Sequence, residues 1–217
     1  MIYRMQNIAI TIPARLNSTR IKEKMLIEFE GKPLVRNVFD SVKTFGLDTF
    51  VLTDSKKIAA TIPSENVIMT GEAENGTARI ASIINQLNYD TFINIQGDML
   101  GITNETINPI INHYSSPSAE FCATAYKKGY SKDGVKIIHS NGLASWFTRS
   151  DIGYGDHHLG IYIYKKIILQ QYHLLKGADD KKENLEQLRI LRYFPMRAIE
   201  VKYEGKEINE LKDLTNG

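Results

Sequence analysis

The chain has 217 residues, of which 42% are hydrophobic and 24% are charged, a composition typical of a globular protein with a sizeable core. Lys and Arg number 27 against 25 Asp and Glu, and this net charge of +2 argues against a non-specific nucleic-acid binder. The single cysteine, Cys122, rules out an internal disulfide, and the N-terminus has no signal-peptide pattern, so we expect a cytoplasmic protein. No apolar run is long enough to cross a membrane, and we expect no membrane contact.

Apolar runs rich in Ile, Val and Phe predict nine strands in chain order. They are NIAITIPA (7–14), DTFVLTD (48–54), NVIMT (66–70), TFINIQG (91–97), AEFCATAY (119–126), VKIIHS (135–140), LASWFTR (143–149), LGIYIY (159–164) and RAIEVKY (197–203). Helical spacing of apolar residues predicts helices in GKPLVRNVFDSVKTFG (31–46) and GTARIASIINQLN (76–88). Two more helices are expected near the end, in KENLEQLRILRYF (182–194) and EINELKDL (207–214).

Strands and helices alternate from residue 7 to about residue 115, which is typical of stacked βαβ units. The first four strands are continuous apolar runs, as expected where both faces of a parallel sheet are covered. The sequence therefore predicts an α/β fold with a doubly wound, mostly parallel sheet. From about residue 115 to residue 164 only strand-like runs follow, which predicts a small antiparallel extension or inserted β-rich lobe within one domain of residues 1–217.

The loop after the first strand carries three cations, Arg15, Arg20 and Lys24. Ligands of open α/β sheets bind beyond the carboxyl ends of the strands, which is where this loop lies. Guanidinium forks and an ammonium group can together hold a polyphosphate, whereas a solvated basic loop is the alternative for each single charge. Neither GxGxxG nor GxxxxGK[ST] occurs, so the loop is not a dinucleotide fingerprint or a Walker loop.

Two other ends of predicted elements carry candidate ligands. Asp98 follows Gln96-Gly97 at the end of the fourth strand, where its carboxylate could bind Mg²⁺, since that cation prefers carboxylate and phosphate oxygens. A plain turn is the alternative there. Gly76 and Thr77 begin a helix whose free amides could bind an anion, the alternative being a simple cap by Asn75.

Seven segments in register resemble the CMP-3-deoxy-manno-octulosonate synthetases, cytidylyltransferases that activate an acidic eight-carbon sugar with CTP. They are IPARLNSTRIKEKML with GKPLVRNV, LTDS, MTGEAENGTARI, INIQGDML, GVKIIHSNGLASWFTRS, HLGIYIYKK and NLEQLRILRY, and they span roughly residues 7 to 214. The resemblance implies a nucleotide-diphospho-sugar transferase type of fold. It also implies a Mg²⁺-dependent enzyme that joins CTP to 3-deoxy-manno-octulosonate, or a related acidic sugar, for lipopolysaccharide or capsule synthesis.

The resemblance also implies roles for single residues. For catalysis it implies Arg15, Arg20, Lys24 and Asp98, and for the metal it implies Asp98 and Asn209. The nucleotide contacts it implies are Pro13, Ala14, Arg15, Asp54, Gly76, Thr77, Arg79 and Gln96. The sugar contacts it implies are Arg149, His158, Tyr162, Glu186 and Gln187. A solvated helix face is the alternative for Glu186 and Gln187, and a place in the core is the alternative for His158 and Tyr162.

One departure from the family concerns the metal. Asn209 stands where the family has an aspartate that supplies a second carboxylate. An amide oxygen can ligate Mg²⁺ but brings no charge, so metal binding should be weaker unless Glu207, Glu210 or Asp213 substitutes.

Two functions therefore stay open. The first is an active cytidylyltransferase, favoured by the cations of the first loop together with Asp98. The second is a catalytically impaired, nucleotide-binding homologue with a regulatory or partner role, favoured by Asn209. The stretch between Arg149 and His158 is also shorter than in the family, on the sugar side. Family members are typically dimers, so a homodimer is expected.

Overall fold

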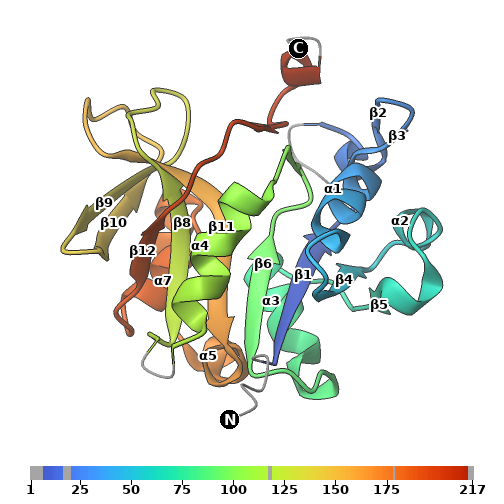
Figure 1. Ribbon diagram of the computed structural model, residues 1–217, viewed down its shortest axis with the longest axis horizontal. Helices are drawn as coiled ribbons and strands as arrows, with labels where there is room; N and C mark the ends of the chain where they lie inside the picture. The colour runs from blue at the N-terminus through green and yellow to red at the C-terminus, as the bar shows by residue number, and fades with distance from the viewer. Residues whose placement is uncertain (1–6, 17–20, 117–118, 178, 215–217) are drawn as a thin grey trace.

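The computed structural model describes residues 7–16, 21–116, 119–177 and 179–214, and within these ranges nine strands pair into one sheet (Figure 1). Its order is β5-β4-β1-β6-β11-β8-β12-β10-β9. The strands are β1 (Ile8–Ala14), β4 (Asp48–Thr53), β5 (Val67–Met69), β6 (Thr91–Ile95), β8 (Cys122–Lys127), β9 (Lys136–Ser140), β10 (Leu143–Thr148), β11 (Asp156–Lys165) and β12 (Arg197–Glu200). Each of the nine apolar runs overlaps one of these strands, so that part of the prediction is confirmed, and β11 begins three residues before its run.

Strands β5, β4, β1 and β6 run parallel to one another, which confirms the α/β prediction for the first half of the chain. Every residue of β1 is buried. Ile8, Ile10 and Ile12 contribute to one core and Ala9 contributes to the other, because successive side chains of a strand point to opposite faces. Covering on both faces explains why this strand reads as a continuous apolar run.

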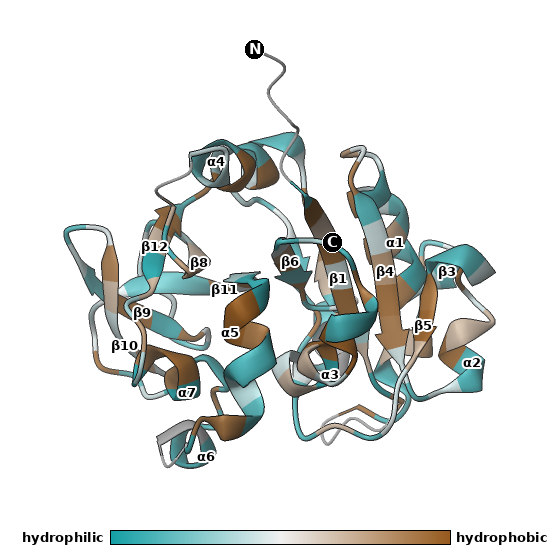
Figure 2. Cartoon of the chain, turned by 90° about the horizontal axis from the view of Figure 1, so that it is seen from below, coloured by the Kyte–Doolittle hydropathy of each residue, from teal (hydrophilic) through white to brown (hydrophobic). Residues whose placement is uncertain are grey.

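Helices form a layer on each side of the sheet (Figure 2). Buried residues of α1 (Leu34–Lys43) and α4 (Asn104–Tyr114) belong to one core, and those of α3 (Gly76–Ile83), α5 (Lys166–Gln171) and α7 (Gln187–Leu191) belong to the other. The remaining helical segments are short: α2 (Lys56–Ala59), α6 (Asp179–Glu183), and the 3-10 turns η1 (Lys24–Leu26), η2 (Ser64–Asn66), η3 (Ile84–Gln86), η4 (Tyr172–Leu174) and η5 (Leu211–Leu214).

The second half of the sheet is mixed. Strand β11 pairs antiparallel with β6, β8 and β9, while β8 pairs parallel with β12, and β10 pairs antiparallel with β12 and β9. The five strands β11, β8, β12, β10 and β9 thus form a closed ring of pairings. The antiparallel part is larger than the small extension expected from the sequence, and it continues the main sheet through β11.

The C-terminal region departs from the prediction. The expected helix over 182–194 is divided into α6 and α7, and Asn184 between them has a φ of 54°, a left-handed conformation that Asn tolerates better than most residues. The expected helix over 207–214 was wrong. Its start belongs to β13 (Lys206–Glu207), which pairs antiparallel with β7 (Met99–Leu100), and only the turn η5 follows. Pairing with a distant segment overrides the local helical pattern here.

One further two-stranded element, β2 (Glu28–Phe29) with β3 (Lys32–Pro33), precedes α1. Within the ranges that the structure describes, no helix has the length and apolar character needed to cross a membrane.

Candidate active site

A polar cleft of about 970 Å³ lies where β1 and β6 end. Most residues that the sequence singled out line it: Pro13, Arg15, Lys24, Gly76, Arg79, Gln96, Asp98, Arg149, His158, Tyr162, Glu186, Gln187 and Asn209. Three others stand behind the lining, namely Ala14 inside β1, Asp54 and Thr77. Arg20 lies outside the described residues. The chain therefore brings segments from residue 13 to residue 209 to one place beyond the carboxyl ends of parallel strands, where ligands of open α/β sheets bind.

The start of α3 is one wall of the cleft. Asn75 caps this helix, because its Oδ1 accepts a hydrogen bond of 2.8 Å from the Ala78 amide. Gly76 has little space beside it: a Cβ atom there would lie 3.0 Å from the Pro13 ring and 3.2 Å from the Gln96 side-chain nitrogen. Glycine at this position lets the end of β1 and the Gln96 side chain approach the helix.

The carboxylate of Glu186 accepts hydrogen bonds at this helix start. The Thr77 hydroxyl donates to its Oε1 at 3.0 Å, and the Thr77 amide donates to its Oε2 at 3.3 Å. Burial raises the pKa of Glu186, while hydrogen bonds from Thr77 and Gly76 and the positive charge of Arg15 act against that rise. Glu186 and Thr77, which the sequence placed in separate subsites, thus form one hydrogen-bonded unit.

Arg79 is held in place by Asp54. Its guanidinium donates to Asp54 Oδ2 at 2.8 Å, to the Gly71 carbonyl at 3.1 Å and to the Thr70 hydroxyl. The Arg79 side chain is only 3% exposed, so these partners fix it almost completely. Arg79 lines the cleft, and Asp54 is joined to the site through this ion pair.

A second part of the cleft is an acidic corner. Lys24, although only 6% exposed, lines the cleft and forms an ion pair with Asp98. Glu207 and Asn209 line the cleft as well. Burial and the negative charge of Asp98 raise the pKa of Glu207 to about 7, against the opposing effects of Asn209, Gly160 and Lys24. The corner combines two carboxylates, one amide and one ammonium group.

The oxygen donors of this corner fit a Mg²⁺ ion. Across the part of the chain that is described, no three His, Cys, Asp or Glu residues gather into a complete metal cage. Mg²⁺ does not need one, since it is usually held by one or two carboxylates together with substrate phosphates and water. The Oε1 atom of Glu207 is buried and has no hydrogen-bond partner within the described ranges, as expected of an oxygen that a cation would satisfy.

Neutral side chains form the third part of the cleft. His158 is 3% exposed, its Nε2 lies 2.7 Å from the Thr124 hydroxyl, and burial lowers its pKa to about 3. The Tyr162 hydroxyl donates to Gln187 Oε1 at 3.3 Å, and the buried Gln187 Nε2 has no partner among the residues whose placement is described. His158 and Tyr162 are thus core residues that also line the cleft. Uncharged donors and acceptors of this kind suit sugar hydroxyls.

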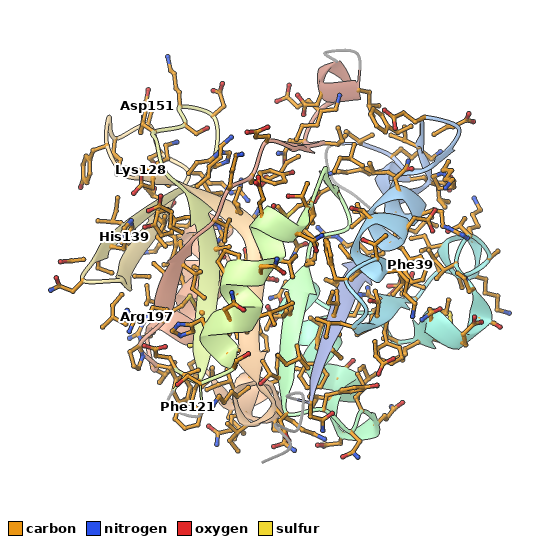
Figure 3. The ribbon with its side chains drawn as sticks, viewed as in Figure 1. Phe39, Phe121, Lys128, His139, Asp151 and Arg197 are labelled. Atoms are coloured by element: carbon orange, nitrogen blue, oxygen red, sulfur yellow. The ribbon has the colours of Figure 1, made fainter. Side chains whose placement is uncertain are left out.

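The far wall consists mainly of residues that no motif of the sequence indicated. Lys127, Ser131, Asp133, His157 and Lys181 line it together with Arg149. Lys127 ends β8, Ser131 and Asp133 lie in the loop after it, His157 lies in β11 and Lys181 in α6. The labelled Lys128 and Asp151 mark two loops of this region at one edge of the molecule (Figure 3). These residues fall in stretches without a local motif, so only the ring of strands reveals that they face the site.

Comparison with known proteins gives a consistent family. The family model described as "Cytidylyltransferase" matches residues 9–215. A 3-deoxy-manno-octulosonate cytidylyltransferase of Chlorobium chlorochromatii is 32% identical over 96% of this chain and 94% of its own length. The corresponding protein of Bartonella quintana is 35% identical over 85% of each chain.

A solved structure has the same fold. It is a CMP:2-keto-3-deoxy-manno-octonic acid synthetase complexed with CTP, and it superposes with a TM-score of 0.87 and 27% identity over 97% of this chain and 96% of that one. The match extends through the mixed half of the sheet as well as the parallel half, since it covers nearly the whole chain. The chain therefore belongs to the cytidylyltransferase family, as the resemblance in the sequence predicted.

Proposed function

We propose that the protein transfers CMP from CTP to 3-deoxy-manno-octulosonate, or to a related acidic sugar, in a Mg²⁺-dependent reaction that releases pyrophosphate. The observation that carries this proposal is the cleft itself, in which a cationic strand end, an acidic corner and a neutral hydrogen-bonding wall meet. The relatives from Chlorobium chlorochromatii and Bartonella quintana carry the corresponding name, and the related solved structure was obtained with CTP.

The nucleotide would lie between the end of β1 and the start of α3. Arg15 is exposed there, directly after the strand, and Arg79 is a fixed guanidinium on the other side. Arginine suits phosphate because its planar fork can donate two hydrogen bonds to one group. Pro13, Gly76 and Gln96 would contact the remainder of the nucleotide through their close packing at the helix start.

The reaction is a displacement at the α-phosphorus. The anomeric oxygen of the sugar bonds to that phosphorus, the bond to the β-phosphate oxygen breaks, and its electron pair leaves with pyrophosphate while the hydroxyl proton passes to solvent. Such transfers depend chiefly on positioning and charge stabilisation. Arg15 and Lys24 would stabilise the charge on the leaving pyrophosphate, and Asp98 with Asn209 or Glu207 would hold the cation. When bound, Mg²⁺ supplies positive charge to the phosphate oxygens.

The acceptor would bind against the neutral wall. Gln187 offers a buried amide nitrogen that no described residue contacts by a hydrogen bond, and Tyr162 is fixed beside it. His158 stays neutral near pH 7 and so serves as a hydrogen-bonding group, because its pKa is about 3. Arg149, on the far wall, is the candidate for the sugar carboxylate.

Pyrophosphate release tests this proposal directly. Wild-type protein with CTP, Mg²⁺ and 3-deoxy-manno-octulosonate should release pyrophosphate, and Asp98→Ala should lose about 10²- to 10³-fold of the rate, the usual cost of removing one such electrostatic group. ATP and UTP in place of CTP serve as controls. If the wild-type protein binds CTP but releases no pyrophosphate with any acidic sugar, the alternative is supported, namely the catalytically impaired homologue that Asn209 favours.

Assembly and location are part of the same proposal. We infer a homodimer that uses the β-rich half, because Leu143 and Trp146 on β10 expose 38% and 39% of their surface. A molecular mass of one chain by light scattering would contradict it. Cys122 is buried and free, which suits the reducing cytoplasm, and the product would serve glycan synthesis at the cell surface.

A further inference from the structure

Two segments that are distant in sequence meet beside Asp98. Glu207 of β13 pairs with Met99 of β7, and the Ile208 amide donates a 3.0 Å hydrogen bond to the Asp98 carbonyl. The two carboxylates therefore belong to neighbouring backbones whose relative position is set by hydrogen bonds. The raised pKa of Glu207, which responds to the charge of Asp98, is consistent with this proximity.

Two glycines hold this crossing in a single arrangement. A Cβ atom on Gly205 would lie 1.9 Å from the Leu100 carbonyl oxygen, and a Cβ on Gly101 would lie 2.8 Å from the Gly205 Cα. Gly101 also has a φ of 73°, which favours glycine. No side chain fits between the two backbones, so they pack in direct contact. This contact places Glu207 next to the segment that carries Asp98.

One carboxylate oxygen in this corner has no partner among the residues that the structure describes. Lys24 forms an ion pair with Asp98, the first carboxylate. The Oε1 atom of the second carboxylate, Glu207, has essentially no exposed surface and accepts no hydrogen bond from the described part of the chain. A buried, unpaired acceptor is costly, and the cost disappears when a cation binds it.

The other two carboxylates that could replace the missing aspartate, Asp213 and Glu210, differ from Glu207 in their surroundings. Asp213 Oδ2 accepts hydrogen bonds of 2.7 Å from the amides of both Asn209 and Glu210, so it caps the turn. Glu210 is exposed at the outer edge of the cleft. The Asn209 side chain acts as a hydrogen-bonding group that opposes the rise in the pKa of Glu207, and both residues line the cleft, so this amide stands beside the Glu207 carboxylate.

We propose that Glu207 and Asp98 are the two carboxylate ligands of the Mg²⁺ site, and that Asn209 is a positioning residue that orients Glu207. This inference rests on the proposed function and specifies its metal site. Asn209 then does not need to bring a charge, because the negative charge that its position lacks is present two residues earlier. Glu207 thus compensates, within the same segment, for the carboxylate that is lost because Asn209 stands in place of an aspartate.

Metal binding by the full chain without nucleotide tests this inference. Mn²⁺ serves as the probe, since electron paramagnetic resonance measures its free concentration directly. Glu207→Gln should weaken Mn²⁺ binding at least tenfold, Asn209→Ala should weaken it less, and Asn209→Asp should not weaken it. Glu204→Gln, which removes the same charge from a side chain that is 82% exposed on the same segment, is the matched control and should bind as the wild type does.

Three results would overturn it: equal affinity in Glu207→Gln and the wild type, a larger loss in Asn209→Ala than in Glu207→Gln, or no Mn²⁺ binding by the wild type at millimolar concentration. The melting temperature of Glu207→Gln confirms that the variant is folded. CTP binding and pyrophosphate release by the wild type are measured in parallel. If both are normal while the Mn²⁺ contrast is absent, only the role of Glu207 fails; if both are missing, the proposed function fails.

Discussion

The carboxylate of Glu186 accepts hydrogen bonds from the hydroxyl and the backbone amide of Thr77, across 109 positions of sequence. This contact joins the approach to α7 with the start of α3, so the acceptor side and the nucleotide side of the cleft share one hydrogen-bonded unit. A helix start that could bind an anion already holds one that belongs to the protein.

Removing the Thr77 hydroxyl should therefore destabilise the fold. Thr77→Val keeps the size of the side chain but leaves Glu186 Oε1 without this donor, and hydrogen bonds to charged groups contribute about 1.5–3 kcal/mol. We expect the free energy of unfolding to fall by a similar amount in urea titrations. Thr77→Ser retains the donor and should lose much less. Equal losses in the two variants would show that the hydroxyl is not what matters.

Asp54 should act on nucleotide binding only through Arg79. Asp54→Asn and Arg79→Lys should each raise the Kd for CTP about tenfold, or ~1.4 kcal/mol, because both release the guanidinium from its fixed position. The double variant should be little worse than either single one, since both changes break the same pair. Isothermal titration with CTP gives the three values, and fully additive losses would mean that Asp54 contacts the nucleotide independently.

Lys136 should support both the stability of the fold and the binding of the sugar at the acceptor wall. It is fully buried, and its ammonium donates to the carbonyls of Lys132, Gly134 and Arg149 at 2.6, 2.8 and 3.1 Å. Lys136→Met leaves these three acceptors unpaired, at about 1–3 kcal/mol each if they stay buried. We expect a lower free energy of unfolding and a higher KM for the sugar, with an unchanged Kd for CTP.

The matched control for that experiment is Lys132→Met, whose side chain is 76% exposed and should leave the sugar KM and the stability unchanged. An equal rise in the Kd for CTP and in the sugar KM of Lys136→Met would contradict a role confined to the acceptor wall. Unchanged kinetics in a destabilised variant would show that Lys136 serves stability alone.

Buried histidines should make stability depend on pH. The pKa of His158 is about 3 and that of His157 about 4, both lowered from the usual 6.5 chiefly by burial. The unfolded chain therefore binds more protons below pH 6.5, and the free energy of unfolding should fall as the pH drops from 6.5 toward 4, by up to about 1.4 kcal/mol per unit for the fully buried His158 and by less for the partly exposed His157.

His158→Asn isolates one of these contributions. Its slope of unfolding free energy against pH, from urea titrations between pH 6.5 and pH 4.5, should be smaller than that of the wild type. His173→Asn changes an exposed histidine and should leave the slope as it is. If the His158 variant kept the full slope, the histidine would be protonated in the folded protein.

Local pattern predicted the strands well, because burial on both faces leaves a signature that each run carries by itself. It failed where distant pairing decides the structure. β11 closes a ring with β9, and β13 joins β7 instead of continuing a helix, and neither event has a nearby signal. The site shows the same division: Arg15 and Asp98 follow strands and could be located, whereas Lys127 and His157 face the cleft only through the ring.

The same limit explains how single residues were assigned. Glu207 could be named from the sequence as one of three carboxylates that might replace the lost aspartate, but only its place beside Asp98 distinguishes it from Glu210 and Asp213. Asp54 stays a predicted nucleotide contact, and the structure adds a partner that the sequence did not indicate, because Asp54 Oδ2 accepts a hydrogen bond from Arg79. Spacing along the chain does not tell which side chain stands in front.

Phosphorus NMR of the complete reaction distinguishes cytidylyl transfer from other uses of CTP. With CTP, Mg²⁺ and 3-deoxy-manno-octulosonate, we expect loss of the three CTP signals and the appearance of a CMP-sugar phosphodiester and pyrophosphate in equal amounts, all abolished when the sugar is omitted. Inorganic phosphate with CDP in place of those products, or CTP that stays intact beside a folded protein that binds it, would contradict cytidylyl transfer by this site.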